Sequence, residues 1–388
     1  MDSSEKNAII PAVKSLKKHI KKDPILYISG LLAAASCFVI HPDPSYIGYI
    51  NFRVLAILFS LMLTVSAMVR IGTFDYLTSK LLHKVKSAGS VSMLLVVFSF
   101  FLSMFLTNDV TLVTVVPFAI AVLWNFKDSK KLMFTLIMLT VAANLGSMMT
   151  PIGNPQNLYL YTKYDMEMGG FIRLMLPYTA LSLILIAVLV FILCRSRNTL
   201  REEKQAAAAP DRIKLLLYVG LFALAVLCVC GVIHWLIMLG VIAAAVFVID
   251  RKAFTKVDYA LLLTFVFFFV LIGNLGRLDA VSDTLSKIVD RSPVLTAVLA
   301  SQVISNVPAA MLLSAFTGDG KALVIGTNLG GLGTLIASMA SLITYKFYAA
   351  LPAAKGEKKP SYLPAFTIIN IAMLIVLYAF YLVMTRIF

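Results

Sequence analysis

Long apolar runs constrain this chain more than any other feature of its sequence. Runs of roughly 20 apolar residues recur along its 388 residues, and this is the length that an α-helix needs to cross about 30 Å of hydrocarbon. Only 14% of the residues are charged, whereas about 25% are charged in a soluble domain. Because a soluble chain of this size needs more polar surface, the sequence excludes a single soluble globule and predicts an all-α polytopic membrane protein.

The basic residues of the chain alternate from loop to loop. Lys and Arg number 34 against 19 Asp and Glu, which leaves a net charge of +15. In a soluble protein this surplus would indicate nucleic acid, but in membrane proteins Lys and Arg collect in short cytoplasmic loops. They gather here in the N-terminal arm and in the loops at 70–87, 127–131, 195–214, 251–256 and 346–359. We therefore expect a cytoplasmic N-terminus, an external C-terminus, a prokaryotic inner membrane and no nucleic-acid partner.

Three short sequence blocks occur twice, in the same order. They are Arg70–Asp75 with Asn274–Asp279, Ser103 and Thr107-Asn108 with Ser301 and Ser305-Asn306, and Asn144-Leu-Gly146 and Thr150 with Asn328-Leu-Gly330 and Thr334. With the loop assignment above, the first block follows an inward-running helix in one half and an outward-running helix in the other. The two halves therefore have opposite orientations, and such inverted repeats build many secondary transporters.

The repeat divides the chain into two halves with matched parts. We predict a cytoplasmic basic arm at 1–24 and a cytoplasmic linker at 195–212. The first half, 25–194, holds an inner hairpin at 88–126 and a broken helix at 132–160, and the second half, 213–388, holds an outer hairpin at 293–317 and a broken helix at 322–345.

A polar tip interrupts one apolar stretch in each half. Thr107-Asn108-Asp109 divides residues 88–126, and Ser305-Asn306 divides residues 293–317. Two complete spans joined by almost no loop would also satisfy the charges in the first half. The arms of the second stretch, at about 11 to 13 residues, are too short to cross a bilayer. We therefore expect a re-entrant hairpin in each half.

The second interruption in each half is rich in glycine. Residues 144–157 contain two glycines and two prolines in an apolar region, and Asn328-Leu-Gly-Gly-Leu-Gly-Thr334 is the counterpart. Irregular backbone at membrane depth persists only where it is buried in protein or lines a watery cavity. Its free carbonyls can hold cations, and half-helix N-termini favour anions. Glycines that only allow close helix packing are the alternative, but two breaks in matched order favour a binding site.

These residues resemble a known family. The tip asparagines, the inverted repeat and the run from Ala143-Asn144-Leu-Gly146 through Thr150-Pro-Ile-Gly-Asn-Pro-Gln-Asn157 are similar to the ion transporter superfamily. That group includes divalent anion:sodium symporters, citrate transporters, arsenite permeases and a class of sodium/proton antiporters. The resemblance covers nearly the whole chain and implies secondary transport by a homodimer.

The tips depart from the dicarboxylate symporters of that superfamily. Those proteins carry Ser-Asn-Thr at both tips, whereas this chain has Thr107-Asn108-Asp109 at the first and Val307-Pro308 after Asn306 at the second. The second tip has lost a hydroxyl and the first has gained a carboxylate. The first tip is therefore closer to the arsenite-permease and antiporter branches.

Asp109 is the acidic residue that we expect to lie nearest the middle of the bilayer. An ionised carboxylate there costs about 2.5–3.5 kcal/mol on insertion scales, so it needs a partner, a cavity or a proton. It could bind sodium, carry a proton, or do both in turn. The alternative is a carboxylate that only caps the following helix by accepting backbone N–H groups.

Together these features predict an ion-coupled transporter of a small anion, either a carboxylate or an inorganic oxyanion, that uses Na⁺ or H⁺. A Na⁺/H⁺ antiporter and an arsenite-type permease are the alternatives. An intramembrane enzyme is disfavoured because H-E-x-x-H and G-x-S-x-G are absent, and we expect no cofactor beyond the coupling ion.

The predicted site residues fall into two groups. Substrate binding is assigned to Thr107, Asn108, Asn144, Thr150, Asn154, Asn157, Ser305, Asn306 and Thr334. Ion coupling is assigned to Asp109, Ser103, Gly146, Ser301, Asn328 and Gly330, with Thr107, Asn108, Asp109 and Gly146 as candidate ligands of Na⁺. The expected partners are this small ionic substrate and the lipid bilayer.

Overall fold

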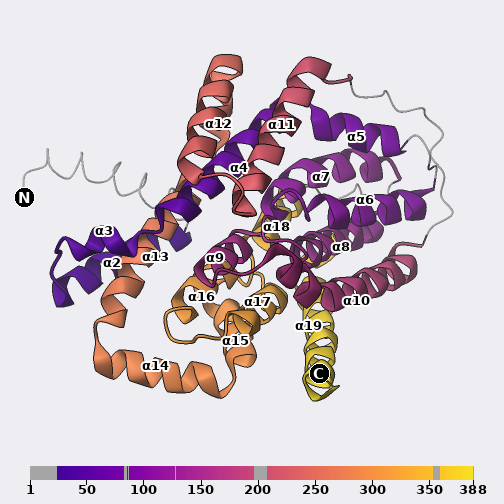
Figure 1. The fold of residues 1–388 in the computed structure, drawn as a ribbon. Helices are drawn as coiled ribbons and strands as arrows, with labels where there is room; N and C mark the ends of the chain where they lie inside the picture. Colours follow the sequence, from indigo (N-terminus) through magenta and orange to yellow (C-terminus); the bar gives the residue numbers. More distant parts are fainter. Residues whose placement is uncertain are drawn as a thin grey trace, which may run out of the picture.

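The computed structural model describes residues 24–82, 85, 87–126, 128–195, 208–352 and 359–387. Within these residues the chain forms α-helices and short 3-10 turns, with no β-strand, and this confirms the predicted all-α class. The predicted basic arm and most of the predicted linker lie outside the described residues. Figure 1 shows the helices as one assembly, with the C-terminus at the lower edge.

Each of the four interrupted stretches of the sequence forms a pair of helices. The first half contains α2 (Pro24–Val39), α3 (Ser45–Tyr49), α4 (Phe52–Arg70), α5 (Thr73–Leu82), α6 (Ala88–Leu102), α7 (Asn108–Leu123), α8 (Ser129–Ser147), α9 (Pro155–Lys163) and α10 (Met168–Cys194). The second half contains α11 (Arg212–Val229), α12 (Trp235–Ile249), α13 (Tyr259–Gly276), α14 (Asp279–Arg291), α15 (Pro293–Ile304), α16 (Asn306–Leu313), α17 (Gly320–Leu329), α18 (Met339–Ala350) and α19 (Tyr362–Ile387).

Helix length distinguishes the hairpin arms from five long apolar helices. Helices α4, α10, α11, α13 and α19 are long and apolar enough to cross a membrane. The hairpin arms are shorter, with 15 residues in α6, 16 in α7, 12 in α15 and 8 in α16, and a span needs about 20. The predicted tips therefore break both apolar stretches, and the glycine-rich segments separate α8 from α9 and α17 from α18.

The helix packing repeats in a crossed pattern. Helix α2, which precedes α4, packs on α13, whereas α12, which precedes α13, packs on α4. In the same way the second hairpin arm α7 packs on α18 of the other half, and its counterpart α16 packs on α9. Figure 1 shows α5 near the upper edge and its counterpart α14 along the lower edge. This arrangement is the one expected for two repeats of opposite orientation.

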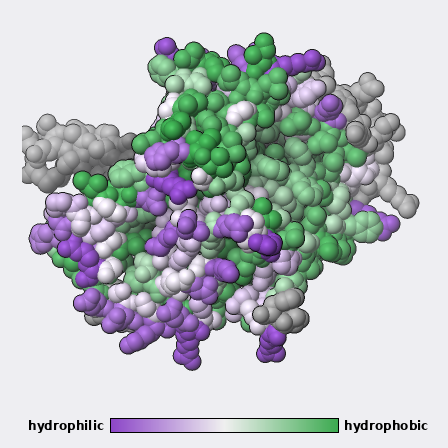
Figure 2. All heavy atoms as spheres, in the orientation of Figure 1, coloured by the Kyte–Doolittle hydropathy of each residue, from purple (hydrophilic) through white to green (hydrophobic). Residues whose placement is uncertain are grey.

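The surface divides into apolar and polar zones. Figure 2 shows a broad apolar surface over the upper and right parts of the molecule. Hydrophilic residues gather along the lower and left edges, where α14 lies, and also occur in the middle of this face and at the tips of the upper edge. Large apolar side chains remain exposed on the long helices, including Phe191, Ile192, Ile213 and Ile368. A contiguous apolar surface of this kind is what a helix bundle presents to lipid.

An ion pair joins helix ends in each of the crossed packings. At the ends of α2 and α13, Arg277 Nη1 lies 2.7 Å from Asp43 Oδ2, and at the ends of α12 and α4, Arg70 Nε lies 2.6 Å from Asp250 Oδ2. Since α2 corresponds to α12 and α4 to α13, the two pairs join equivalent helix ends, although the sequence repeat aligns Arg70 with Asn274 rather than with Arg277. Hydrogen bonds from Ser45 and Arg277 hold the pKa of Asp43 below its ordinary value of 3.8.

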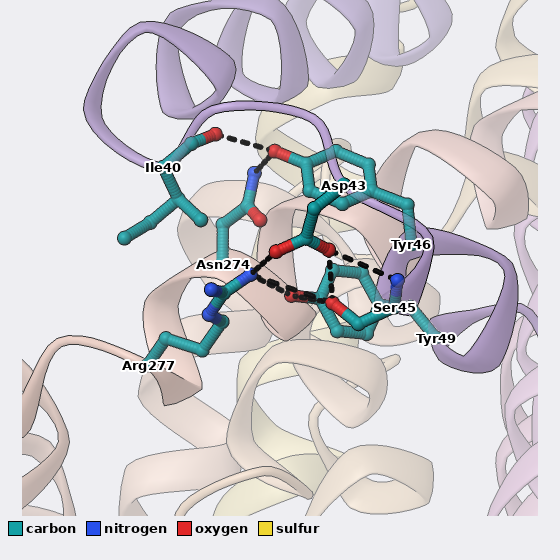
Figure 3. A network of polar contacts seen from close by, with 7 residues as sticks. All are labelled: Ile40, Asp43, Ser45, Tyr46, Tyr49, Asn274 and Arg277. Carbon is teal, nitrogen blue, oxygen red and sulfur yellow. Dashed lines mark hydrogen bonds and ion pairs between the residues drawn. The ribbon is translucent and has the colours of Figure 1, made fainter.

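Figure 3 shows the first of these pairs inside a larger network. Arg277 also donates to the hydroxyl of Tyr49 at 3.1 Å. Nearby, Asn274 Nδ2 donates to the hydroxyl of Tyr46 at 2.8 Å, and that hydroxyl donates to the Ile40 carbonyl at 2.5 Å. These contacts tie the loop after α2 and the short helix α3 to the end of α13.

Candidate functional site

The tip of the first hairpin is capped by Thr107. Its backbone is extended, and its hydroxyl accepts a hydrogen bond from the Val110 N–H at 3.4 Å. Asn108 Oδ1 accepts the N–H of Asp109 at 2.9 Å. The carboxylate of Asp109 is therefore not the N-cap of α7, and the capping role that was its alternative belongs to the neighbouring threonine.

The tip of the second hairpin is held in a strained conformation. Ser305 has φ +73°, in the left-handed region that side chains other than glycine rarely adopt. The following Asn306 donates its backbone N–H to the Ala337 carbonyl at 3.0 Å, and its side-chain oxygen accepts the Val307 N–H at 3.0 Å. Asn306 therefore organises its tip as Asn108 organises the first, and it also joins the tip to the second broken helix.

Asn144 connects three of the predicted elements. Asn108 Nδ2 donates to Asn144 Oδ1 at 2.9 Å, and Ser338 Oγ donates to the same oxygen at 3.0 Å. Asn144 Nδ2 in turn lies 3.5 Å from the Gly331 carbonyl. All of these side chains are buried. The first hairpin tip and both helix breaks therefore meet at one asparagine.

The second broken helix makes a matching contact. Asn328 Nδ2 donates to Asn157 Oδ1 at 2.6 Å, and Asn157 Nδ2 donates to the carbonyls of Ser147 at 3.3 Å and Thr150 at 3.2 Å. Each asparagine of a broken helix thus bonds a residue that follows the break in the other half. These reciprocal hydrogen bonds couple the conformations of the two breaks, because a movement of one break would leave a buried polar group of the other without its hydrogen-bond partner.

Equivalent contacts hold each break against its hairpin. The hydroxyl of Thr150 donates to the Met104 carbonyl, and the hydroxyl of Thr334 donates to the Gln302 carbonyl at 3.1 Å. These threonines and their acceptors occupy matching repeat positions, so the structure reproduces the repeat at atomic detail. Asn154 donates to Ser147 Oγ at 2.5 Å.

The paired serines and glycines form close contacts between the hairpins and the broken helices. A Cβ built on Gly146 would lie 2.6 Å from Ser103 Oγ, and one built on Gly330 would lie 2.7 Å from Ser301 Oγ. The serine hydroxyls donate to carbonyls of their own helices. Close packing is therefore what the structure shows for these four residues, and their role in ion coupling stays a prediction.

A cavity of about 900 Å³ lies beside this polar core, and both halves line it. Asp109 stands on its wall, and its Oδ1 is buried with no hydrogen-bond partner among the described residues. The other polar lining residues are Ser66, Arg70, Thr114, Lys256, Asp258 and Lys346. The basic ones come from loops that the sequence assigns to the cytoplasm. An unpartnered buried carboxylate oxygen beside a cavity this size can accept a cation or a proton.

The predicted site residues separate into two layers. Asp109 lines the cavity, whereas Asn108, Asn144, Ser305 and Asn306 are buried behind it. Thr150, Asn154, Asn157 and Thr334 tie the breaks together through the contacts above. Direct substrate contact by these residues stays a prediction.

Sequence reasoning missed Ser338, Gln302 and the charged residues of the cavity. Ser338 could have been found, because it occupies the position that Asn154 holds in the first half. Gln302 had no such signal, since its counterpart is the apolar Met104. Arg70, Lys256 and Lys346 were recognised only as basic loop residues, and Asp258 was not singled out.

Comparisons with known proteins agree with this architecture. The citrate transporter family model, CitMHS, matches residues 20–318. The transporter MJ0456 of Methanocaldococcus jannaschii is 35% identical over 301 residues, covering 76% of this chain and 81% of that protein. The inner membrane protein YbiR of Escherichia coli is 30% identical over 318 residues, covering 80% and 84%.

A more distant similarity covers part of the chain. The transporter arsB of Dictyostelium discoideum is 28% identical over 152 residues, which is 39% of this chain and 26% of that protein. The resemblance to the ion transporter superfamily is confirmed, and the family consists of transporters rather than enzymes. The crossed repeat, the two interrupted hairpins and the family match together show that this chain is a membrane transporter of the citrate transporter family.

Proposed function

We propose that this transporter is a secondary carrier of a small anion, either a carboxylate or an inorganic oxyanion, coupled to Na⁺ or H⁺. The observation that carries the proposal is the unpartnered Oδ1 of Asp109 on the wall of a cavity that both halves line. A carboxylate at this place repels an anionic substrate unless a cation or proton neutralises it. Binding of the substrate and the coupling ion would therefore favour each other, which is the requirement for moving both in the same direction.

The charges around the cavity support an anionic substrate. Arg70, Lys256 and Lys346 line it together with the acidic Asp109 and Asp258. Once a cation or a proton neutralises Asp109, basic charge is in excess, and such an excess around a cleft raises the local concentration of anions. Arg70 is engaged by Asp250, whereas no ion pair joins Lys256 or Lys346 to another described residue. The two lysines would attract the anion, and the amides behind the cavity would supply donors and acceptors once the tips move.

Alternating access is supported by the crossed packing. Helices α7 and α18 line the cavity with several residues each, and their counterpart α16 contributes Leu312. Helix α16 packs against α13, and α9, which does not line the cavity, packs against α4. On α9, the ring of Tyr159 lies 5.9 Å from that of Phe269 and 6.2 Å from that of Phe265. If the two halves exchanged these packings, the present cavity would close and an equivalent one would open on the opposite side.

A Na⁺/H⁺ antiporter or an arsenite-type permease is the second candidate. The carboxylate at the first tip favours it, because Asp109 could exchange a proton for a sodium ion without any anionic substrate. The partial similarity to a protein named arsB points in the same direction.

Thermal stabilisation of the purified protein by candidate ligands tests these functions. Citrate, smaller dicarboxylates, sulfate, arsenite, Na⁺ and Li⁺ are each added across a pH series, with choline chloride as the ionic-strength control. We expect an anion to stabilise the protein, and more strongly when the coupling cation is present. Ligands that stabilise the protein are then tested for transport by measuring their flux into proteoliposomes. Stabilisation by Na⁺ or Li⁺ alone, with no anion effect and with Na⁺-driven proton flux, would establish the antiporter instead.

A further inference from the structure

The side chain of Gln302 fills the helix break of the second half. Its Nε2 donates to the carbonyls of Gly330 and Leu332, each at 2.9 Å. Its Oε1 accepts the N–H of Thr334 at 2.9 Å. Carbonyls released where a helix breaks need a partner when they are buried. In this half, a neutral amide satisfies them.

The first half has no amide at the equivalent position. Thr150 donates to the Met104 carbonyl as Thr334 donates to the Gln302 carbonyl, so Met104 is the counterpart of Gln302. A thioether has no N–H to donate. The carbonyls that correspond to those of Gly330 and Leu332 belong to Gly146 and Met148. The Gly146 carbonyl accepts from the Met149 N–H at 3.2 Å, but no described residue donates a hydrogen bond to the carbonyl of the buried Met148.

The carboxylate of the hairpin tips is likewise present in one half and missing from the other. Asn108 and Asn306 each accept the N–H of the residue that follows, so Asp109 and Val307 are equivalent. Asp109 has a buried oxygen without a partner, whereas Val307 has no polar side-chain atom. The carboxylate and the unpartnered carbonyl are therefore both in the first half, where the second half has a valine and an amide. The buried oxygen without a partner at the second break is the neutral amide oxygen of Asn328.

We propose that Gln302 is an internal substitute for a cation in the second half, so that each transport cycle is coupled to a single cation bound in the first half. The proposal rests on the ion-coupled function proposed above and adds the number and the place of the coupling ion. Amide N–H groups satisfy the carbonyls as a cation would, but they never dissociate. The second break therefore keeps its shape whether or not an ion is present, and only the first break responds to the ion gradient.

A reciprocal pair of variants tests this assignment in the purified full-length protein. Met104→Gln gives the first half the amide of the second, and Gln302→Met gives the second half the thioether of the first. Thermal stability is measured against Na⁺, Li⁺ and proton concentration, with choline replacing the metal ions. In the wild type we expect a response to one of these ions with a Hill coefficient of about 1.

The two variants should change the response of thermal stability to the ion in opposite directions. Met104→Gln should weaken the response at least tenfold in ion concentration, because its amide occupies the carbonyls of the first break. Gln302→Met should raise the Hill coefficient above 1, because the second break then needs an ion. A wild-type Hill coefficient near 2, or an unchanged response in Met104→Gln, would overturn the proposal, and both can be measured even if Gln302→Met does not fold.

The same titrations separate this proposal from the function on which it rests. Absence of any response of the wild type to all three ions would count against ion coupling itself. A response with the wrong Hill coefficient would leave ion coupling in place and remove only the role of Gln302.

Discussion

Arg277 Nη1 lies 2.7 Å from Asp43 Oδ2, and this ion pair fixes the end of α2 to the end of α13 across the two halves of the chain. Its counterpart, Arg70 with Asp250, fixes α4 to α12. The helices that the two ion pairs join differ in sequence, yet both pairs join equivalent helix ends. This relationship indicates that α2, α4, α12 and α13 form one framework, against which the hairpins and broken helices are held.

The Asp43 pair should make stability depend on acid pH. The pKa of Asp43 lies below 3.8 in the folded protein because Ser45 and Arg277 hydrogen-bond to its ionised carboxylate. The resulting stabilisation is present above the unfolded value and is lost as pH falls through the folded pKa. Asp43→Asn should therefore lower the melting temperature at pH 6, and the difference from wild type should shrink below pH 4. A difference that is the same at pH 6 and pH 3 would contradict this assignment.

Asp109→Asn should uncouple transport from the ion gradient. The amide keeps the shape of the side chain but carries no charge, so the cavity no longer needs a cation to accept an anion. Gradient-driven accumulation in proteoliposomes should fall at least tenfold, while exchange of substrate across the membrane persists. Asp279→Asn, at the first turn of α14, is the matched control and should transport normally. Accumulation equal to wild type, with an unchanged pH profile, would remove Asp109 from coupling.

The two unpaired lysines of the cavity should set the salt dependence of substrate binding. In Lys256→Gln combined with Lys346→Gln, the apparent affinity for the anion should fall several-fold at low ionic strength. The loss should disappear at high salt, because a Debye length near 3 Å at about 1 M screens the attraction. Lys252→Gln removes a nearby exposed charge that does not line the cavity, so its affinity should match wild type. A loss of the same size in this control would indicate a general effect of net charge.

Gly146→Ala should destabilise the first break. The added Cβ would lie 2.6 Å from Ser103 Oγ and would also meet the Phe100 carbonyl, so backbone has to move. Overpacking of this kind costs about 1–3 kcal/mol, and the melting temperature should fall accordingly. Gly220→Ala is the control, because a Cβ there meets nothing within 4 Å and alanine favours a helix. Equal melting temperatures for Gly146→Ala and wild type would show that the α6–α8 contact is looser than described.

The length of the apolar runs and the charge of the loops between them were sufficient to predict a bundle of membrane helices. Apolar runs of sufficient length must be helical in lipid, since every backbone group there has to be satisfied within the protein. Polar or glycine-rich residues inside such runs mark the breaks, as Thr107–Asp109 and Gly330 do. These signals are local, so the helices of both hairpins end and begin at the polar tips that the sequence marks.

Only the tertiary structure decided how the predicted site residues divide their roles. Residues with the same side-chain chemistry point either to a cavity or to a neighbouring helix, and sequence spacing does not distinguish these two orientations. Asp109 lines the cavity, whereas Thr150 and Asn157 hold the breaks together. The sequence by itself determined a membrane transporter built from two inverted halves, because hydrophobicity and loop charge act over whole segments. The crossed contacts Asn144–Ser338 and Asn328–Asn157, and the amide of Gln302 in the second break, depend on long-range packing that no local pattern encodes.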